Sequence, residues 1–339
     1  MDGVSRAAMK NRLKHSSAYR LYRFLLLRRR LLTTQEAIAI ELTDRCNLRC
    51  GYCPKGNNIR VGGGDMDFGF FKTVVAQASH LGAKQVALVG FGEPLLYPYL
   101  FEAISHIRSN YPAMRTCLTT NGVLLDDAMS RKLIESGLDQ ITISINFNSN
   151  AKYALNNRAK VFERVVENAI QFLRLLNSEN RLRKPQTYIQ ILENLNTPSE
   201  IIEFKNFWRP HLGPNALVQV QPLVNWGGLV RIENRREEGA RYPCSHLLSG
   251  WIVTKDGKAL ACCMVFPYNS ASNELILGNI RDNSLEQLGH GAKATCLRLN
   301  NMNCEYEKMP TCNKCDAYWT APNIYIRNPF YPLVGTRWL

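Results

Sequence analysis

Three cysteines near the start of the chain have a spacing that suits an iron–sulfur cluster. Cys46, Cys50 and Cys53 form a C-x3-C-x2-C run. Three thiolates on one loop can hold three irons of a [4Fe–4S] cubane, and the fourth iron is then free to chelate a small molecule. A zinc ion would require four ligands, and no fourth Cys or His lies nearby in the sequence. The run therefore predicts a cluster with one open iron.

A second set of cysteines lies in the last hundred residues. Two of them stand on separate segments, and two form a C-x2-C pair further on. These four are Cys244, Cys262, Cys312 and Cys315. Four thiolates can close either an iron–sulfur cubane or a zinc site, and the spacing alone does not choose the metal. Cys296 and Cys304 are weaker candidates to replace one of the four.

The composition describes a basic globular protein. The 339 residues are 45% apolar and 21% charged, which allows a sizeable core. The net charge of +14 suits an acidic protein partner, an anionic substrate, a membrane surface or nucleic acid. We do not expect nucleic acid, since no motif for binding it is present. Eleven cysteines in metal-type spacings and no apolar run of about 18 residues predict a reducing, cytoplasmic location.

Short apolar strands alternate with amphipathic helices from residue 37 to about residue 231. This alternation predicts parallel strands joined by right-handed crossovers. The predicted strands are Ala37–Thr43, Gln85–Phe91, Arg115–Asn121, Gln140–Asn146, Thr187–Glu193 and Ala216–Leu223. The predicted helices are Phe68–Leu81, Tyr99–Ser109, Asp126–Glu135, Val161–Leu176 and Pro198–Trp208.

The predicted strands are polar on one face. In residues 140–146, three isoleucines alternate with Thr142, Ser144 and Asn146. A sheet covered by helices on both sides would be apolar on both faces, so the pattern favours an open barrel with a polar lining. Six strands are too few to close an eight-stranded barrel. The predicted fold class is therefore α/β, a partial (β/α)6 TIM-like barrel followed by a small cysteine-rich domain.

Four segments are expected along the chain. Residues 1–36 read as a basic amphipathic helical arm, residues 37–233 as the partial barrel, residues 234–320 as the cysteine-rich domain and residues 321–339 as a tail. The polar stretch Asn234–Gly239 marks the boundary between barrel and cysteine-rich domain. The arm either packs across the bottom of the barrel, which we favour, or contacts a membrane surface.

The first cysteine run resembles the signature of the radical S-adenosylmethionine (SAM) superfamily, C-x3-C-x-aromatic-C, with Tyr52 at the aromatic position. The resemblance covers roughly residues 37–230. It implies that the three thiolates hold a [4Fe–4S] cluster whose open iron binds SAM. One-electron reduction then yields a 5′-deoxyadenosyl radical, which removes a hydrogen atom from a C–H bond of the substrate. A flavodoxin- or ferredoxin-type protein is the implied electron donor.

Other residues match segments that hold SAM in this superfamily. Gly90-Phe91-Gly92-Glu93-Pro94 resembles its Gly-Gly-Glu-Pro segment, where backbone groups and the glutamate hold the methionine amino group. Polar residues at the ends of the next strands are implied to meet the methionine carboxylate, the ribose or the substrate, and Asn225 lies in the region that contacts adenine. The strand-end candidates are Thr120, Asn121, Ser144, Asn146, and Gln190 or Glu193.

The C-terminal cysteines resemble the cluster-binding extensions called SPASM and, in shortened form, twitch. A full SPASM domain has seven cysteines and two extra clusters, but this chain has no cysteine after Cys315. The resemblance therefore implies one auxiliary [4Fe–4S] cluster, with zinc as the alternative. The implied ligands are Cys244, Cys262, Cys312 and Cys315.

Cys263 stands beside a predicted ligand and admits three roles. It could replace that ligand, fill space as a small buried hydrophobe, or donate a hydrogen atom to a substrate radical. The third role would make the protein an epimerase. In a dehydrogenase, the substrate radical would instead lose a second electron to the auxiliary cluster. Cys263 favours epimerisation slightly.

The substrate class follows from the polar lining and the charge. A sugar, an aminocyclitol or a nucleoside-like metabolite suits a polar barrel, and the positive charge also suits an anionic one. About 36 residues precede the first strand, too few for the peptide-binding winged helix of many relatives. The alternatives are a maturase of a ribosomal peptide and, from another class, a non-catalytic iron–sulfur or zinc binding protein.

Overall fold

The computed structural model describes residues 37–56, 63–232, 244, 246–268 and 274–317. The predicted N-terminal arm, the boundary at Asn234–Gly239 and the tail at 321–339 lie outside the described residues. Within the described residues, no helix is both long and apolar enough to cross a membrane.

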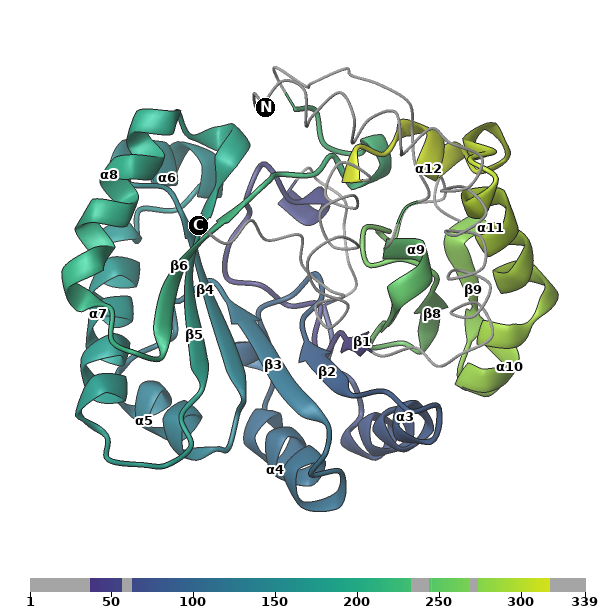
Figure 1. The fold of residues 1–339 in the computed structure, drawn as a ribbon, viewed down its shortest axis with the longest axis horizontal. Helices are drawn as coiled ribbons and strands as arrows, with labels where there is room; N and C mark the ends of the chain where they lie inside the picture. The colour runs from purple at the N-terminus through teal and green to yellow at the C-terminus, as the bar shows by residue number, and fades with distance from the viewer. Residues whose placement is uncertain (1–36, 57–62, 233–243, 245, 269–273, 318–339) are drawn as a thin grey trace, which may run out of the picture.

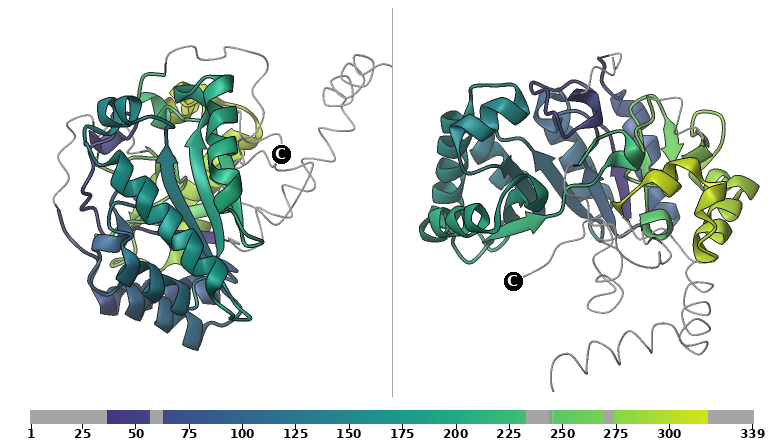
Figure 2. Two further views of the ribbon diagram at one scale, coloured as in Figure 1. Left: turned by 90° about the vertical axis from the view of Figure 1, so that its left-hand side faces the viewer. Right: turned by 90° about the horizontal axis from the view of Figure 1, so that it is seen from above.

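The described residues form one mixed sheet with helices outside it (Figure 1). Its order is β6-β5-β4-β3-β2-β1-β7-β8-β9, and neighbours from β6 to β7 are parallel. The first six strands are Ala37–Ile40 (β1), Gln85–Leu88 (β2), Arg115–Thr120 (β3), Gln140–Asn146 (β4), Gln186–Leu192 (β5) and Ala216–Gln221 (β6). The sheet curves without closing, which confirms the predicted partial barrel (Figure 2).

Helices cover the outer face of the first six strands, one after nearly every strand (Figures 1 and 2). They are Phe68–His80 (α3), Leu100–Asn110 (α4), Asp127–Glu135 (α5), Asn150–Asn157 (α6), Phe162–Ser178 (α7) and Pro198–Trp208 (α8). Side-chain caps fix several starts: Asp67 accepts from the Phe70 N–H before α3, and Thr197 forms a capping box with Glu200 before α8. Among these helices, α6 was not predicted.

The cysteine-rich segment continues the sheet. Strand β7 (Gly250–Val253) pairs in parallel with β1, and β8 (Lys258–Leu260) and β9 (Ile276–Asn279) follow as antiparallel strands. The segment also contains α9 (His246–Ser249), α10 (Leu285–His290), α11 (Ala292–Met302) and α12 (Pro310–Lys314). The sequence predicted a small domain here but not its pairing with β1, because short strands carry too little pattern to specify a distant partner.

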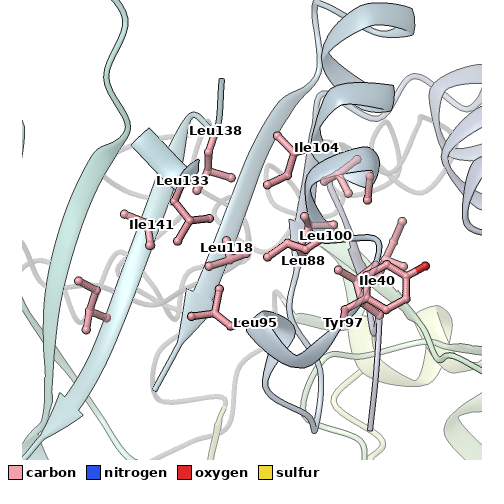
Figure 3. Packing of buried hydrophobic residues seen from close by; sticks show 14 of the residues in the cluster. Ile40, Leu88, Leu95, Tyr97, Leu100, Ile104, Leu118, Leu133, Leu138 and Ile141 are labelled. Atoms are coloured by element: carbon pink, nitrogen blue, oxygen red, sulfur yellow. The ribbon is translucent and has the colours of Figure 1, made fainter. Parts of the chain in front are cut away.

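The main core lies between the sheet and the outer helices. The isoleucines of β4 point outward and are fully buried, as their alternation with polar residues predicts. Figure 3 shows Leu88 and Leu118 of the neighbouring strands close to Leu100 and Ile104 of α4. Burying one such side chain contributes about 1.5–3 kcal/mol, so this layer holds the strand ends in place.

The inner face of the sheet has two different halves. On β1, β2 and β3 it carries Ala39, Ala87 and Cys117, which are buried in a second apolar cluster with residues of the cysteine-rich segment, including Leu260. On β4 to β6 the same face carries the polar residues Ser144, Gln190 and Gln219, as predicted, together with Leu192 and Leu217. The polar lining is therefore confined to one half, because the cysteine-rich segment packs against the other.

Two glycines bring the loop after β2 against the loop after β1. A Cβ on Gly92 would lie 2.1 Å from the Thr43 carbonyl oxygen and 2.7 Å from that of Arg45, and a Cβ on Gly90 would lie 2.6 Å from the Cβ of Glu41. The Glu93 N–H donates to the Arg45 carbonyl at 2.8 Å. Only glycine allows this approach, which sets the position of Glu93.

We predict that Gly92→Ala destabilises the protein by about 1–3 kcal/mol, because backbone oxygens cannot move aside as a flexible side chain would. Gly51→Ala is the matched control, since its Cβ would meet only the Asn156 carbonyl at 3.6 Å. Urea unfolding of both variants measures the difference. Equal midpoints for the two variants would contradict the close approach.

Candidate active site

The first cysteine loop follows β1 and is held by α6. The Gly51 N–H donates to the Asn156 carbonyl at 2.7 Å, and the Arg158 guanidinium donates to the Gly56 carbonyl at 2.8 Å. A turn also closes within the loop, from the Cys53 N–H to the Cys50 carbonyl. Helix α6, which the sequence did not predict, is therefore one of the elements that hold the loop.

The three thiols of this loop share one buried environment. Burial raises the pKa of Cys50 to about 12, the Tyr52 hydroxyl opposes this rise, and the Cys53 and Cys46 thiols add to it. Burial also raises the pKa of Cys46 and of Cys53. Because the thiols influence one another, they face a common space, and this donor set fits three corners of a cubane. Metal binding there must release protons.

A hydrogen-bond chain connects this loop with the inner face of the barrel. The Tyr52 hydroxyl, which interacts with the Cys50 thiol, accepts from Asn146 Nδ2 at 3.1 Å. Asn146 Oδ1 accepts from Gln190 Nε2 at 3.3 Å, and the same Nε2 lies 3.2 Å from Ser144 Oγ. Four residues predicted to bind the cofactor are therefore in one network. Glu193 lies in a short exposed turn after β5, so Gln190 is the inward-facing choice.

Asn146 has an unusual backbone at the centre of this chain. Its φ is +68°, at a register shift where β4 leaves β5. Asn tolerates this left-handed conformation better than other residues except glycine. Its carbonyl accepts from Asn196 Nδ2 at 2.8 Å, which holds the conformation in place. Sequence reasoning missed Asn196, and nothing in the local pattern distinguishes it.

Glu93 joins the ends of β2 and β3. Its carboxylate accepts from the Leu95 N–H at 3.1 Å, from Thr120 Oγ1 at 2.7 Å and from the Asn121 N–H at 2.8 Å. Burial outweighs these hydrogen bonds and raises the pKa of Glu93 to about 7. The Asn121 amide continues toward the cysteine loop, donating to Asn47 Oδ1 at 2.7 Å. Pro94 begins the short buried turn that follows Glu93.

The second set of cysteines meets around one cavity. Cys244, Cys262, Cys312 and Cys315 all line it, together with apolar residues that include Leu247, Val265 and Leu275. Burial raises the pKa of Cys315 to about 12, and the pKa values of the other three are raised as well. Among the described residues, no group of three or more His, Cys, Asp or Glu side chains is arranged to hold a metal ion, and this applies to both cysteine sets. A sulfur-lined apolar cavity fits a cluster.

The remaining cysteines of the C-terminal segment are not among the residues that line this cavity. Cys296 is exposed, and Cys304 has a left-handed backbone with φ +59°. Cys263 contacts the thiol of Cys262, and its own sulfur lies 3.7 Å from Nδ1 of the buried His246. Cys263 also packs against the inner apolar cluster that contains Cys117.

Asn225 connects the barrel with the last cysteine pair. Its N–H donates to Asp316 Oδ1 at 2.8 Å, its Nδ2 donates to the Lys314 carbonyl at 2.7 Å, and its Oδ1 accepts from the Asp316 N–H at 3.2 Å. Its side chain thus positions the second cysteine set. A contact of Asn225 with adenine stays a prediction.

Two further contacts join the halves of the molecule, and sequence reasoning missed both. The Phe91 ring packs 5.6 Å from the Trp226 ring and 4.8 Å from the Phe266 ring. Glu41, fully buried after β1, accepts from the Phe91 N–H at 3.1 Å and from the Tyr268 hydroxyl at 2.8 Å. In the sequence, Glu41 is a charged residue between the apolar residues Ile40 and Leu42. This interruption of an apolar strand was the available signal for a buried polar contact.

Comparison with known families places both cysteine sets in recognised domains. A sequence model of the radical SAM superfamily matches residues 40–195, and a model of an iron–sulfur cluster-binding domain, SPASM, matches residues 244–316. The first match contains Cys46, Cys50 and Cys53, and the second contains all four cysteines of the cavity.

Individual relatives agree with these two matches. GTP 3',8-cyclase of Chlorobaculum tepidum is 30% identical over 199 residues, which are 59% of this chain and 58% of that enzyme. The chain thus spans less than two thirds of that relative. BtrN in complex with AdoMet and 2-DOIA has the same fold, with a TM-score of 0.55 and 19% identity over 83% of this chain and 92% of that one.

A second solved structure, Streptococcus suis SuiB bound to S-adenosylmethionine, has a TM-score of 0.62 and 16% identity over 78% of this chain and 68% of that one. Its likeness concerns the fold. The first cysteine run after β1, the open barrel and the second cysteine set agree with both domain matches. The chain therefore belongs to the radical SAM superfamily and carries a C-terminal iron–sulfur cluster-binding domain of the SPASM type.

Proposed function

We propose that the chain is a radical SAM enzyme that abstracts a hydrogen atom from a small polar metabolite and thereby epimerises or oxidises it. Cys46, Cys50 and Cys53 would hold the SAM-binding [4Fe–4S] cluster. The observation that carries this proposal is the hydrogen-bond chain from the Cys50 thiol through Tyr52 and Asn146, which brings the cluster loop beside a polar barrel face. Together, the reduced cluster and SAM supply a 5′-deoxyadenosyl radical.

The chain's own residues would bind and orient SAM. One carboxylate oxygen of Glu93 accepts from a single donor among the described residues, the Asn121 N–H, so that oxygen can also accept from the methionine ammonium. Gly90 and Gly92 bring this carboxylate beside the cysteine loop, and hydrogen bonds from Thr120 and Asn121 hold it there. Pro94 begins the turn that follows Glu93. Ser144, Asn146 and Gln190 offer hydroxyl and amide groups to the carboxylate and ribose, and Asn225 would approach the adenine.

The second site would hold the auxiliary [4Fe–4S] cluster. Its ligands would be Cys244, Cys262, Cys312 and Cys315, which share the apolar cavity. Such a cluster can accept the second electron of an oxidation. In an epimerisation, Cys263 would donate its hydrogen atom to the substrate radical, and the electron donor plus a proton would restore the thiol. The packing of Cys263 against the inner apolar cluster supports this role.

The polar half of the inner face supports a sugar, an aminocyclitol or a nucleoside-like substrate, and the net charge of +14 also suits an anionic one. By their names, relatives and neighbours act on GTP or were solved with 2-DOIA or with a precursor peptide, so a peptide maturase remains the second candidate. A flavodoxin- or ferredoxin-type donor and a cytoplasmic location suit this chemistry. A non-catalytic metal-binding protein would not need the SAM-binding arrangement around Glu93.

Iron content and SAM cleavage test the proposal. After anaerobic reconstitution we expect about eight irons per chain and release of 5′-deoxyadenosine with SAM and dithionite. Cys46→Ala should lose about half the iron and all of the release, because one iron of the first cluster loses its thiolate. Absence of 5′-deoxyadenosine from the wild type would exclude the enzyme, and zinc in place of half the iron would exclude the auxiliary cluster.

The adjacent pair Cys262 and Cys263 provides a matched comparison. Cys262→Ala should lose about four irons, whereas Cys263→Ala should keep about eight, because only the first lines the cavity. With a substrate in hand, Cys263→Ala should still cleave SAM and consume substrate hydrogen but form no epimer. An unchanged epimer yield from this variant would refute the donor role.

Glu93 gives a pH-dependent prediction. Its pKa of about 7 in the folded protein exceeds the value of 4.5 expected when exposed, so the unfolded state loses this proton first as the pH rises. Folding stability should therefore fall between about pH 4 and pH 7, by up to about 3 kcal/mol.

The control is Glu93→Gln, which lacks this titration. The measurement is the thermal midpoint of reconstituted protein without SAM at about pH 5 and at about pH 8. The midpoint should fall from the lower to the higher pH, and it should fall more in the wild type than in the variant. Added SAM should reduce the wild-type fall, because an ammonium beside Glu93 favours the ionised carboxylate. Identical pH profiles for both proteins would argue against a buried titrating Glu93.

A further inference from the structure

One polar atom on the inner face of the barrel lacks a partner. The side chain of Gln219, on β6, is 6% exposed, and its Oε1 is buried without a hydrogen-bond partner among the described residues. A buried acceptor in this state costs about 1–3 kcal/mol, and native structures rarely leave one unmatched. A ligand that supplies an O–H or N–H would satisfy it.

The location of Gln219 connects it with the proposed cofactor site. Strand pairing aligns Ser144 of β4 with Gln190 of β5, and Gln190 with Gln219 of β6. The three residues therefore form one row across the inner face. Gln190 turns its donor toward β4, to Ser144 and Asn146, and away from β6. Gln219 is next in the row, on the side away from the cysteine loop.

The other buried unpartnered atoms lie elsewhere in the described part of the chain. His106 and Arg108 are on α4, and Tyr153 and Asn157 are on α6, all outside the sheet. Asp44, Asn148 and Asn196 follow strand ends. Gln219 alone among them is within a strand, on the polar half of the lining.

We propose that Gln219 is a substrate-binding residue whose Oε1 accepts a hydrogen bond from a hydroxyl or amino group of a small metabolite. This inference rests on the function proposed above. It narrows the substrate class, because a carbonyl oxygen repels a phosphate. The part of the substrate that meets Gln219 Oε1 must therefore carry an O–H or N–H donor, and an anionic group of the substrate must lie away from that oxygen.

The test compares Gln219→Met, which removes the acceptor at similar length, with Gln219→Glu, which keeps it and adds a charge. The first readout is urea unfolding without substrate. Gln219→Met should unfold at or above the wild-type midpoint, because an unsatisfied buried carbonyl has been removed. A lower midpoint would show that the amide already has a structural partner and would overturn the proposal.

The second readout is stimulation of 5′-deoxyadenosine release by myo-inositol, glucosamine, guanosine or triglycine. For the stimulating metabolite, Gln219→Met should raise the half-maximal concentration about tenfold. Gln219→Glu should leave the half-maximal concentration at the wild-type value for a metabolite that donates from a hydroxyl group. For glucosamine, whose ammonium group is attracted by the added charge, the half-maximal concentration should fall. Equal values for Gln219→Met and wild type, stimulation by triglycine alone, or stimulation by none of the four would overturn the proposal.

Release of 5′-deoxyadenosine by the wild type without any added probe separates this inference from the proposed function. If the wild type releases none under reducing conditions, the function itself fails. If it does release 5′-deoxyadenosine and Gln219→Met responds to the probes as the wild type does, only the role of Gln219 fails.

Discussion

The parallel pairing of β1 with β7 is the interaction on which the rest of the structure depends. β1 pairs with β2 on one side and with β7 on the other, from Ala37–Gly250 to Ile40–Val253. The first cysteine loop follows β1, and two cysteines of the second set flank β7 and β8 in the chain, Cys244 before β7 and Cys262 after β8. One continuous sheet thus fixes the position of two metal-binding regions that are about two hundred residues apart in the sequence.

Buried polar contacts reinforce this pairing where the two regions meet. Glu41 accepts hydrogen bonds from the Phe91 N–H on the barrel side and from the Tyr268 hydroxyl on the C-terminal side. The Asn225 N–H donates to Asp316 Oδ1 in the loop of the last cysteine pair. In each contact, the polar groups are removed from water and are hydrogen-bonded to one another. Breaking one hydrogen bond therefore leaves its donor and acceptor buried without partners. This cost holds the auxiliary site in a defined orientation toward the barrel.

Both cysteine sites combine burial with neighbouring thiols. Burial favours the neutral thiol and raises its pKa, whereas metal binding requires the thiolate, so the two demands oppose each other until the metal arrives. The same burial excludes water from the site. A reactive radical requires this exclusion, because water would open the way to side reactions. The inner face of the sheet has two parts: the apolar part packs against the C-terminal segment, and the other part carries the polar row of Ser144, Gln190 and Gln219.

Local sequence patterns predicted the family, the order of the first six strands and of five helices between them, and the composition of both cysteine sets. These are local signals: a C-x3-C-x2-C run, alternating strands and helices, and polar residues at strand ends. It also predicted the polar face of β4, because side-chain alternation depends only on the strand. The tertiary fold establishes that β7 extends the sheet, that α6 contacts the first loop and that Asn225 bonds to the last cysteine loop. It also leaves Gln219 Oε1 without a hydrogen-bond partner among the described residues. Those features depend on which distant segments meet, and short-range sequence patterns do not encode long-range pairing.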